Sequence, residues 1–462
     1  MANRVPGLIE LDRLVLTQQA HRLADNRIRS QAAPWTSFGG WFADRSSLAE
    51  RAQPQALRIE VTLTVEAGQV ELATIDSQDR IFDNTRIDAT MGLVRAELYA
   101  LDARTFDGVV LRQADDQPVV LCLHDLAVWD LEPAAVPADP DRLLAYYDLR
   151  RNPISYDFAM FLMAAERERA ARGLEGIFVV FAPPDHNAIH YFPTGYDGVI
   201  DRQSRRWRFA NVVLPMLEFL PTVRGHMVAA SRHDALRLAA SARHLYPGPI
   251  ENTEVPTHVF YRRVNADPDF RPGQGVRLHA PPQGVRYAEQ WLKERALGRK
   301  LVTITLRQYG YLAQRNSDEA AWLAFARSLD ASDYFVVFLP DTDRALELGE
   351  AFPGFATLPE ASFSLGLRMG LYEKAWLNLA TAGGPMMALL LSQSCRFLIF
   401  RILVEGSFLS TVAHAEGNLG FKVGQQPAYL HPTQRLVWEA DSVEALTREF
   451  AAMRERIVDE RE

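Results

Sequence analysis

Arginine, tyrosine and asparagine residues follow an apolar run in the second half of the chain, where they could bind a phosphate group. Arg307 ends the run 301–306, and Tyr309, Arg315 and Asn316 come shortly after it. A guanidinium group pairs with phosphate oxygens through two parallel hydrogen bonds, so an arginine at the end of a buried strand suits a diphosphate. The alternative is a surface loop whose arginines are solvated. The pattern makes Arg307 the first candidate for contact with a diphosphate.

Two acidic residues, Asp341 and Asp343, follow the next apolar run, 334–339. A pair of this spacing can hold a divalent metal ion that bridges a diphosphate. An acidic residue at the start of a helix equally caps the free N–H groups there. We favour the helix cap, and we leave open a contact of either residue with a ribose or a base.

A glycine-rich turn, Gly383, Gly384 and Pro385, stands between an expected strand and an expected helix. Proline suits the first turn of a helix, the glycines let a ligand approach the backbone, and the helix start favours an anion. A tight structural turn is the alternative. The sequence lacks the spacing of a dinucleotide fingerprint and of a P-loop, which argues against those two classes. Arg368 and Tyr372 lie four residues apart on the preceding expected helix, so they share a face. They could line a nucleotide site, or they could simply be half-buried.

Candidates for a catalytic base are Asp185 and His186, which follow the buried-strand run IFVVFAPP. His186 and His190 are four residues apart, but they lack a helical pattern and an acidic motif, so we expect no metal ion there. We expect no cofactor either. The chain has no G-x-S-x-G motif, and its two cysteines, Cys122 and Cys395, have no supporting motif, which argues against a nucleophilic hydrolase.

The elements that must position these residues differ between the first third of the chain and the rest. From 56 to about 130, β-branched residues alternate with polar ones in short runs, which predicts an antiparallel β-sandwich. The segment PWTSFGGWF, 34–42, fits neither period. We favour aromatic packing on the sandwich over a platform for sugars. The stretch EPAAVPADPD after the sandwich is the expected linker.

From residue 143 onwards, apolar runs alternate with helical patterns, which predicts parallel sheets covered on both faces. The expected strands begin at 177 and 226 and then cover 301–306, 334–339, 376–380 and 397–400. The expected helices are 156–172, 207–219, 233–245, 287–297, 318–329, 364–374, 385–392 and 442–458. The segment 249–284 is rich in proline and glycine, lacks sustained periodicity and divides two α/β halves. We therefore expect an α/β fold with an added β domain: an N-terminal antiparallel β-sandwich with its leading segment (1–135), and two Rossmann-like α/β halves (143–280 and 285–462).

Composition limits the classes of function. The chain has 462 residues, enough for about three domains, and its 48% hydrophobic and 23% charged residues are ordinary for a globular protein. A formal net charge of −8 argues against general binding to nucleic acid. No apolar stretch reaches the roughly 20 residues of a membrane span, and the N-terminus lacks a signal peptide core. We expect a cytoplasmic protein, with peripheral association with the inner membrane left open.

Two α/β halves, an arginine after the first strand of the second half and a Gly-Gly-Pro turn before a late helix resemble the GT-B glycosyltransferases. The resemblance covers 143–458 and includes heptosyltransferase-like and fucosyltransferase-like branches and, most of all, proteins of bacterial surface-polysaccharide biosynthesis. It implies a nucleotide-sugar donor in the C-terminal half and an acceptor presented by the N-terminal half, without an essential metal. It places Arg307 on the donor diphosphate, Gly383, Gly384 and Pro385 at the phosphate or ribose, and Asp341 near the nucleotide. The other expected donor contacts are Tyr309, Arg315, Asn316 and Arg368.

The expected function is therefore transfer of a sugar from a nucleotide-sugar to a glycan or lipid-linked glycan acceptor. Arg307 would stabilise the departing diphosphate, and Asp185 or His186 would take the proton of the acceptor hydroxyl. Two alternatives stay open: a non-catalytic GT-B-like module for binding or assembly, and a nucleotide-sugar epimerase, which shares the α/β architecture but leaves the β-sandwich unexplained. The sequence leaves open a homo-oligomer.

Overall fold

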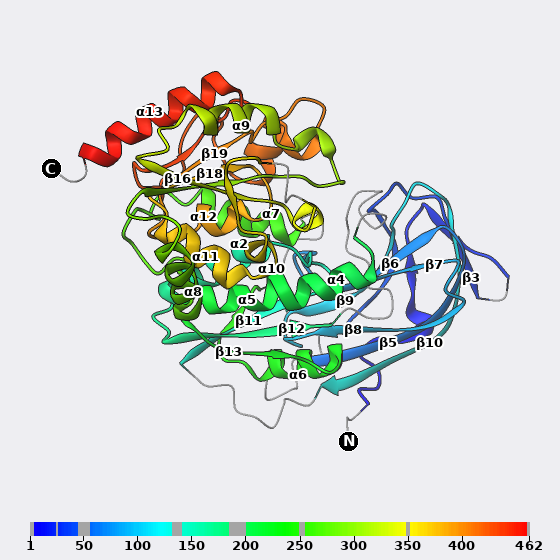
Figure 1. Cartoon of the computed structure of the whole chain (residues 1–462). Coiled ribbons are helices and arrows are strands. Elements are labelled where there is room, and N and C mark those ends of the chain that lie inside the picture. Colours follow the sequence, from blue (N-terminus) through cyan, green and yellow to red (C-terminus); the bar gives the residue numbers. More distant parts are fainter. Residues whose placement is uncertain are drawn as a thin grey trace. The chain divides into compact units, whose positions relative to one another are not determined.

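A computed structural model describes residues 4–24, 26–44, 56–131, 141–183, 200–248, 255–347 and 352–459. The fold is mixed α/β, with antiparallel sheets in the first third of the chain and a parallel sheet in the last third (Figure 1). The chain divides into two compact units. Unit 1 comprises Met1–Arg150, Phe178–Ile189 and His226–Glu254, and unit 2 comprises Arg151–Ile177, His190–Gly225 and Val255–Glu462. The three-part division expected from the sequence stays a prediction.

Two five-stranded antiparallel sheets form the larger part of unit 1. One has the order β1 (Val15–Leu16), β4 (Ser37–Phe42), β9 (Phe106–Gln113), β6 (Gln69–Asp76), β7 (Ile81–Asp88); the other has the order β2 (Ala20–Arg22), β3 (Arg27–Ser30), β10 (Val119–Leu131), β5 (Ala56–Ala67), β8 (Leu93–Ala100). Strand β7 alternates buried and half-buried residues along its whole length, as a strand with one face on a core does. Apolar side chains of both sheets, such as Ile59 of β5 and Leu72 of β6, belong to one buried cluster. Each such side chain contributes about 1.5–3 kcal/mol by leaving water, so this shared core holds the two sheets.

The aromatic segment 34–42 contains a strand, although its sequence predicts no regular structure. Strand β4 forms because Gly40 lets the neighbouring strand approach: a Cβ there would lie 2.8 Å from the carbonyl oxygen of Val109. Trp41 is 1% exposed, and its indole N–H donates to the carbonyl of Leu11. The packing interpretation is thus confirmed for Trp41.

A four-stranded sheet has the order β13 (Val223–Val228), β12 (Gly176–Ala182), β11 (Arg142–Asp148), β14 (Leu245–Tyr246). Strands β11 and β14 are parallel. Helix α6 (Arg232–Ser241) ends earlier than its periodicity predicts, because the residues after it extend and pair with β11. Tertiary pairing therefore overrides the helical pattern at 245.

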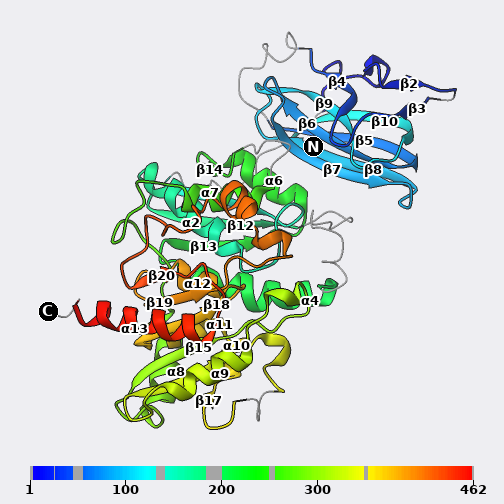
Figure 2. The same cartoon turned by 90° about the horizontal axis from the view of Figure 1, so that it is seen from above.

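Unit 2 is built on a six-stranded sheet in which every pairing is parallel. Its order is β17 (Ala356–Thr357), β16 (Tyr334–Leu339), β15 (Lys300–Thr305), β18 (Leu377–Thr381), β19 (Phe397–Phe400), β20 (Gln434–Leu436). The central strands are continuous apolar runs because both of their faces are buried. In Figure 2 these strands lie among the helices of the unit. The helices are α2 (Phe158–Ala171), α4 (Arg202–Arg208), α5 (Leu214–Met216), α7 (Pro256–Asn265), α8 (Pro282–Lys293), α9 (Glu319–Ser328), α10 (Glu360–Phe363), α11 (Leu365–Lys374), α12 (Met386–Leu390) and α13 (Val443–Asp459).

Helix α7 lies inside the segment 249–284, where the sequence predicts no periodic element. Pro256 occupies its first turn, where a missing N–H costs nothing. One face, with Phe260, Tyr261 and Val264, is buried. The prediction that this segment lacks a periodic element is therefore wrong for Pro256–Asn265, which adds a helix to unit 2. The division of two α/β halves at this segment stays a prediction. None of the described helices has the length and apolar character that crossing a membrane requires.

Candidate functional site

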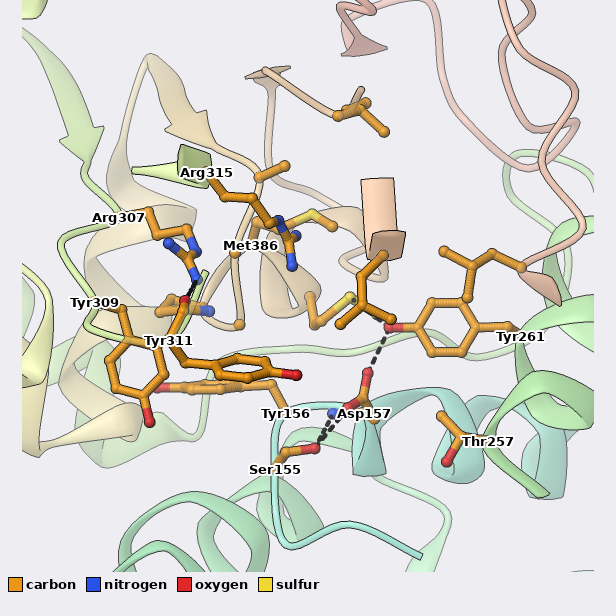
Figure 3. Close-up of a pocket in the computed structure, with 18 of the residues that line it drawn as sticks. Ser155, Tyr156, Asp157, Thr257, Tyr261, Arg307, Tyr309, Tyr311, Arg315 and Met386 are labelled. Carbon is orange, nitrogen blue, oxygen red and sulfur yellow. Dashed lines mark hydrogen bonds between the residues drawn. The ribbon is translucent and has the colours of Figure 1, made fainter. Parts of the chain in front are cut away.

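A cavity of about 300 Å³ opens in unit 2 beside the carboxyl ends of the parallel strands (Figure 3). Residues after β15, β16 and β18 line it, as expected for a ligand site of a parallel sheet. The structure brings most of the expected donor-site residues to this wall. They are Arg307, Tyr309, Arg315, Asp341, Gly383, Gly384 and Pro385.

The guanidinium group of Arg307 donates hydrogen bonds to residues of its own loop. Nη2 donates to the carbonyl of Tyr311 at 2.6 Å, and Nη1 donates to the carbonyl of Leu312 at 3.2 Å and to the side-chain oxygen of Asn316. The same Asn316 oxygen accepts the backbone N–H of Tyr309 at 3.1 Å. Burial and the nearby charge of Arg315 lower the pKa of Arg307 to about 10. Arg307 and Asn316 therefore shape the loop that carries the cavity wall, and Asn316 does not line the cavity itself.

Arg315 presents its guanidinium group to the cavity. Among the described residues, no hydrogen bond or ion pair of this side chain is found, and its Nε is buried without a partner. Figure 3 shows the group pointing into the space between the lining residues. Burial lowers its pKa, but an arginine stays charged. The Asp157 carboxylate acts on this charge from a distance, without a direct ion pair. A half-buried cation that makes no direct pair with the described residues is suited to an anion, so the alternative of a solvated surface arginine is wrong here.

Asp341 caps a short helical turn, Thr342–Arg344. Its Oδ1 accepts the N–H of Thr342 at 2.8 Å, and its Oδ2 accepts the N–H of Gln308 at 3.2 Å. The capping interpretation is confirmed. Burial, and then the charge of Asp341, raise the pKa of Asp343. Within the described ranges, no group of three or more His, Cys, Asp and Glu side chains is placed to hold a metal ion.

The glycine turn makes room for side chains of the protein. A Cβ on Gly384 would lie 2.5 Å from the ring of Tyr156, and a Cβ on Gly383 would lie 3.4 Å from the side chain of Arg307. Both glycines and Pro385 still line the cavity. The turn therefore needs glycine first of all for close packing inside the protein.

Arg368 does not line the cavity. It is 1% exposed, and its guanidinium group donates to the carbonyls of Ala361 at 2.7 Å and Pro340 at 3.2 Å. It also donates to the hydroxyl of Tyr372 at 3.2 Å, in agreement with their shared helix face. Arg368 thus stabilises the segment after β16 through its hydrogen bond to the carbonyl of Pro340.

An acid that sequence reasoning missed, Asp157, stands in the cavity just before α2. Its Oδ2 accepts the hydroxyl of Ser155 at 2.6 Å, and its Oδ1 accepts the hydroxyl of Tyr261 at 2.7 Å (Figure 3). A carboxylate has about four acceptor positions, so two donors leave capacity for a ligand hydroxyl. The Ser-x-Asp pattern before a helix was the available signal for this acid. Tyr261 gave none, since α7 was not expected.

Two histidines on the wall, His258 and His414, lie edge to face with their ring centres 5.6 Å apart. The side-chain amide of Asn418 lies 3.0 Å from Nδ1 of His414. Burial, and then the charges of His258 and Arg315, lower the pKa of His414 to about 4. His414 is therefore uncharged at neutral pH in the free protein, next to the cation of Arg315.

The two candidates for a catalytic base, Asp185 and His186, lie outside the described residues. The same holds for His190. Their assignment stays a prediction.

Glycosyltransferases are among the solved structures that the chain resembles. A glycosyl transferase of family 9 from Veillonella parvula shares 10% identity over 70% of this chain and 99% of its own, with a TM-score of 0.39. ADP-heptose LPS heptosyltransferase II from E. coli shares 10% identity over 70% of this chain and 100% of its own, with a TM-score of 0.38. The fucosyltransferase NodZ from Bradyrhizobium shares 11% identity over 55% and 94%, with a TM-score of 0.25. No family model and no curated protein matches the chain. These three structural neighbours are glycosyltransferases, the class that the sequence resembles.

Proposed function

We propose that this protein transfers a sugar from a nucleotide-sugar donor to a glycan or lipid-linked glycan acceptor, in the cavity of unit 2. One observation carries the proposal: the cavity holds an arginine, Arg315, that makes no hydrogen bond or ion pair with the described residues, together with a carboxylate, Asp157, that two hydroxyl groups hold in place. An anion site and a base in one cavity are the two groups that this reaction requires.

In the proposed reaction, the acceptor hydroxyl gives its proton to the Asp157 carboxylate. The acceptor oxygen then forms a bond to the anomeric carbon of the donor, and the bond from that carbon to the diphosphate breaks. The electron pair of that bond leaves with the diphosphate, whose added negative charge the guanidinium of Arg315 stabilises. Ser155 and Tyr261 aim the carboxylate by donating to its two oxygens.

The proposed site changes one donor contact expected from the sequence and adds a base from the described residues. Arg315, in place of Arg307, contacts the diphosphate, since three of the five N–H donors of Arg307 already bond to its own loop and Arg315 has no such bond among the described residues. Asp341 stays near the nucleotide, with the N–H bonds of its cap holding the carboxylate. Asp157 is the proposed base among the described residues.

For the finer architecture, we propose that the two antiparallel sheets are a β-sandwich that binds glycan or mediates assembly. The shared core of the two sheets supports a sandwich. We propose further that the α/β remainder is a pair of Rossmann-like halves of the GT-B type. The parallel six-stranded sheet with helices between its strands supports the second half.

Binding of nucleoside diphosphates tests the anion site. We expect Arg315→Met to lower the affinity for the best of ADP, GDP, UDP and CDP by about ten- to a hundredfold, as loss of a charge-assisted pair does. The measurement is isothermal titration calorimetry. The matched control is Arg327→Met, an exposed arginine of α9, which should bind like the wild type.

Turnover tests the base. We expect Asp157→Asn to bind the same nucleoside diphosphate while transfer from the matching nucleotide-sugar falls by about 10²- to 10⁴-fold. The control is the exposed Asp333→Asn. A wild-type protein that binds none of the four diphosphates overturns the donor site. Binding without product formation from any donor supports the non-catalytic module, and a changed donor without transfer supports the epimerase.

A further inference from the structure

A buried carboxylate that the proposed reaction does not use, Asp441, lies just before α13 and is 1% exposed. Its Oδ2 accepts the backbone N–H of Asp318 at 3.1 Å and the indole N–H of Trp322 at 2.8 Å. Its Oδ1 accepts Nη1 of Arg401 at 2.8 Å. One side chain thus collects donors from segments that are far apart in the sequence.

A chain of hydroxyl groups connects Asp441 to the start of the cavity loop 307–317. Thr381 donates to Oδ2 of Asp441 at 3.3 Å, and Ser317 donates to Thr381 at 2.7 Å. The backbone N–H of Arg307 donates in turn to Ser317 at 2.8 Å. An ionised carboxylate only accepts hydrogen bonds, so it orients both hydroxyl groups toward itself and leaves the Ser317 oxygen facing the N–H of Arg307.

A second connection runs through Arg401 to the residue beside Arg315. Nη1 of Arg401 pairs with Asp441, and Nη2 donates to the carbonyl of Gln314 at 3.0 Å. Arg401 has a left-handed backbone with a φ of 60°, which a non-glycine residue adopts only where its surroundings hold it. The two connections therefore reach the loop at Gln314 and Ser317, on either side of Arg315.

We propose that Asp441 is a positioning residue that fixes loop 307–317 so that Arg315 stands in the cavity before a ligand arrives. The inference rests on the proposed function, because its test measures anion binding at Arg315. A guanidinium group that is already in place binds an anion without the cost of ordering a loop. Asp441 itself does not line the cavity, so it acts through the loop alone.

A double-mutant cycle tests the coupling, with inorganic pyrophosphate and the best of the four nucleoside diphosphates as probes. We expect Asp441→Asn to lower the affinity about tenfold in the wild-type background and less than about twofold in the Arg315→Met background. A general loss of structure would lower the affinity by the same factor in both backgrounds. Equal factors overturn the inference.

A second pair of variants decides the question if Asp441→Asn does not fold. Thr381→Val removes the hydroxyl connection to the loop, and Trp322→Phe removes a bond to the same carboxylate oxygen that leads only to α9. We expect Thr381→Val to weaken binding of both probes and Trp322→Phe to lower the melting temperature with binding unchanged. The double variant Thr381→Val/Arg401→Met removes both connections, and equal binding by it and the wild type overturns the inference. If Arg315→Met itself binds the probes like the wild type, the proposed donor site fails instead.

Discussion

Arg307 and Arg315 belong to one loop and both line the cavity, but their guanidinium groups meet different neighbours. Arg307 donates to the carbonyls of Tyr311 and Leu312 and to Asn316, whereas Arg315 has no partner among the described residues. Residue type alone makes the two equivalent for phosphate binding. Because of this difference in hydrogen bonding, we assign Arg307 to holding the loop and Arg315 to binding the ligand.

His414 gives a pH dependence that belongs to this residue scale. Its pKa is about 4 in the folded protein and about 6.5 in an unfolded chain. Between these values the unfolded chain binds a proton that the folded protein does not, so stability falls as the pH decreases from 6.5 to 4. We expect His414→Gln to lose less melting temperature than the wild type over that range, measured by thermal denaturation in matched buffers.

The control for this variant is the exposed His21→Gln, which should follow the wild type at every pH. Parallel curves for His414→Gln and the wild type would contradict the lowered pKa of His414.

At the scale of elements, the backbones of helices α8 and α11 approach each other closely at Gly284, Gly366 and Gly370. A Cβ on Gly370 would lie 2.3 Å from the carbonyl oxygen of Gly284, and a Cβ on Gly284 would lie 2.0 Å from that of Gly366. Both partners are backbone atoms, which cannot rotate away. The glycines therefore set how closely the two helices approach, and α11 leads directly into β18 and the cavity turn.

Gly370→Ala tests this crossing. Alanine favours an isolated helix by about 1 kcal/mol over glycine, but overpacking costs about 1–3 kcal/mol. Because the clash is with backbone, we expect the steric term to win and the free energy of unfolding of unit 2 to fall. Urea denaturation measures it, with Gly417→Ala as the control, since a Cβ there meets nothing within 4 Å. A variant as stable as the wild type would mean that the helices can separate at little cost.

At the scale of the whole molecule, a buried charge network joins the antiparallel sheets of unit 1 to its α/β part. Asp83 of β7 pairs with Arg150 and, at 2.7 Å, with Arg232 of α6, which also binds Asp148 of β11 at 2.7 Å. Burial acts to raise the pKa of Asp148, but Arg232 and Arg150 outweigh it and lower the pKa to about 2. The network ties β7, β11 and α6 within one unit.

Removal of one acid from this network leaves buried cations without their partner. We expect Asp83→Asn to lower the free energy of unfolding of unit 1 by about 3–5 kcal/mol, the usual cost of breaking a buried pair. Guanidinium denaturation followed by circular dichroism measures the change. The exposed Asp116→Asn should stay within about 0.5 kcal/mol of the wild type. A loss below about 1 kcal/mol for Asp83→Asn would contradict the role of the network.

The path of the chain also decides where the cavity residues come from. Unit 2 is assembled from three segments, and Asp157, Tyr261 and Arg315 reach the cavity from two of them. The sequence divided these residues between an acceptor half and a donor half. In the structure they face one space of about 300 Å³.

The sequence by itself determined the helices and strands that have a regular hydrophobic period. Strands β16 and β19 have the expected bounds, α11 and α13 lie within a residue of theirs, and Asp341 caps as expected. These features depend on local periodicity and on the few residues around a helix start, which a reader of the sequence can see.

Only the tertiary structure decided which side chains meet. Helix α7 stayed hidden because prolines and glycines around it interrupt the period, and its stability comes from packing of Phe260 and Val264. The pairing of Arg307, the unpaired state of Arg315, the aim of Asp157 and the hydroxyl chain from Asp441 all join residues that are distant in the sequence or that differ only in orientation. Hydrogen bonds depend on distances of a few ångströms between such residues, and these distances exist only once the chain has folded.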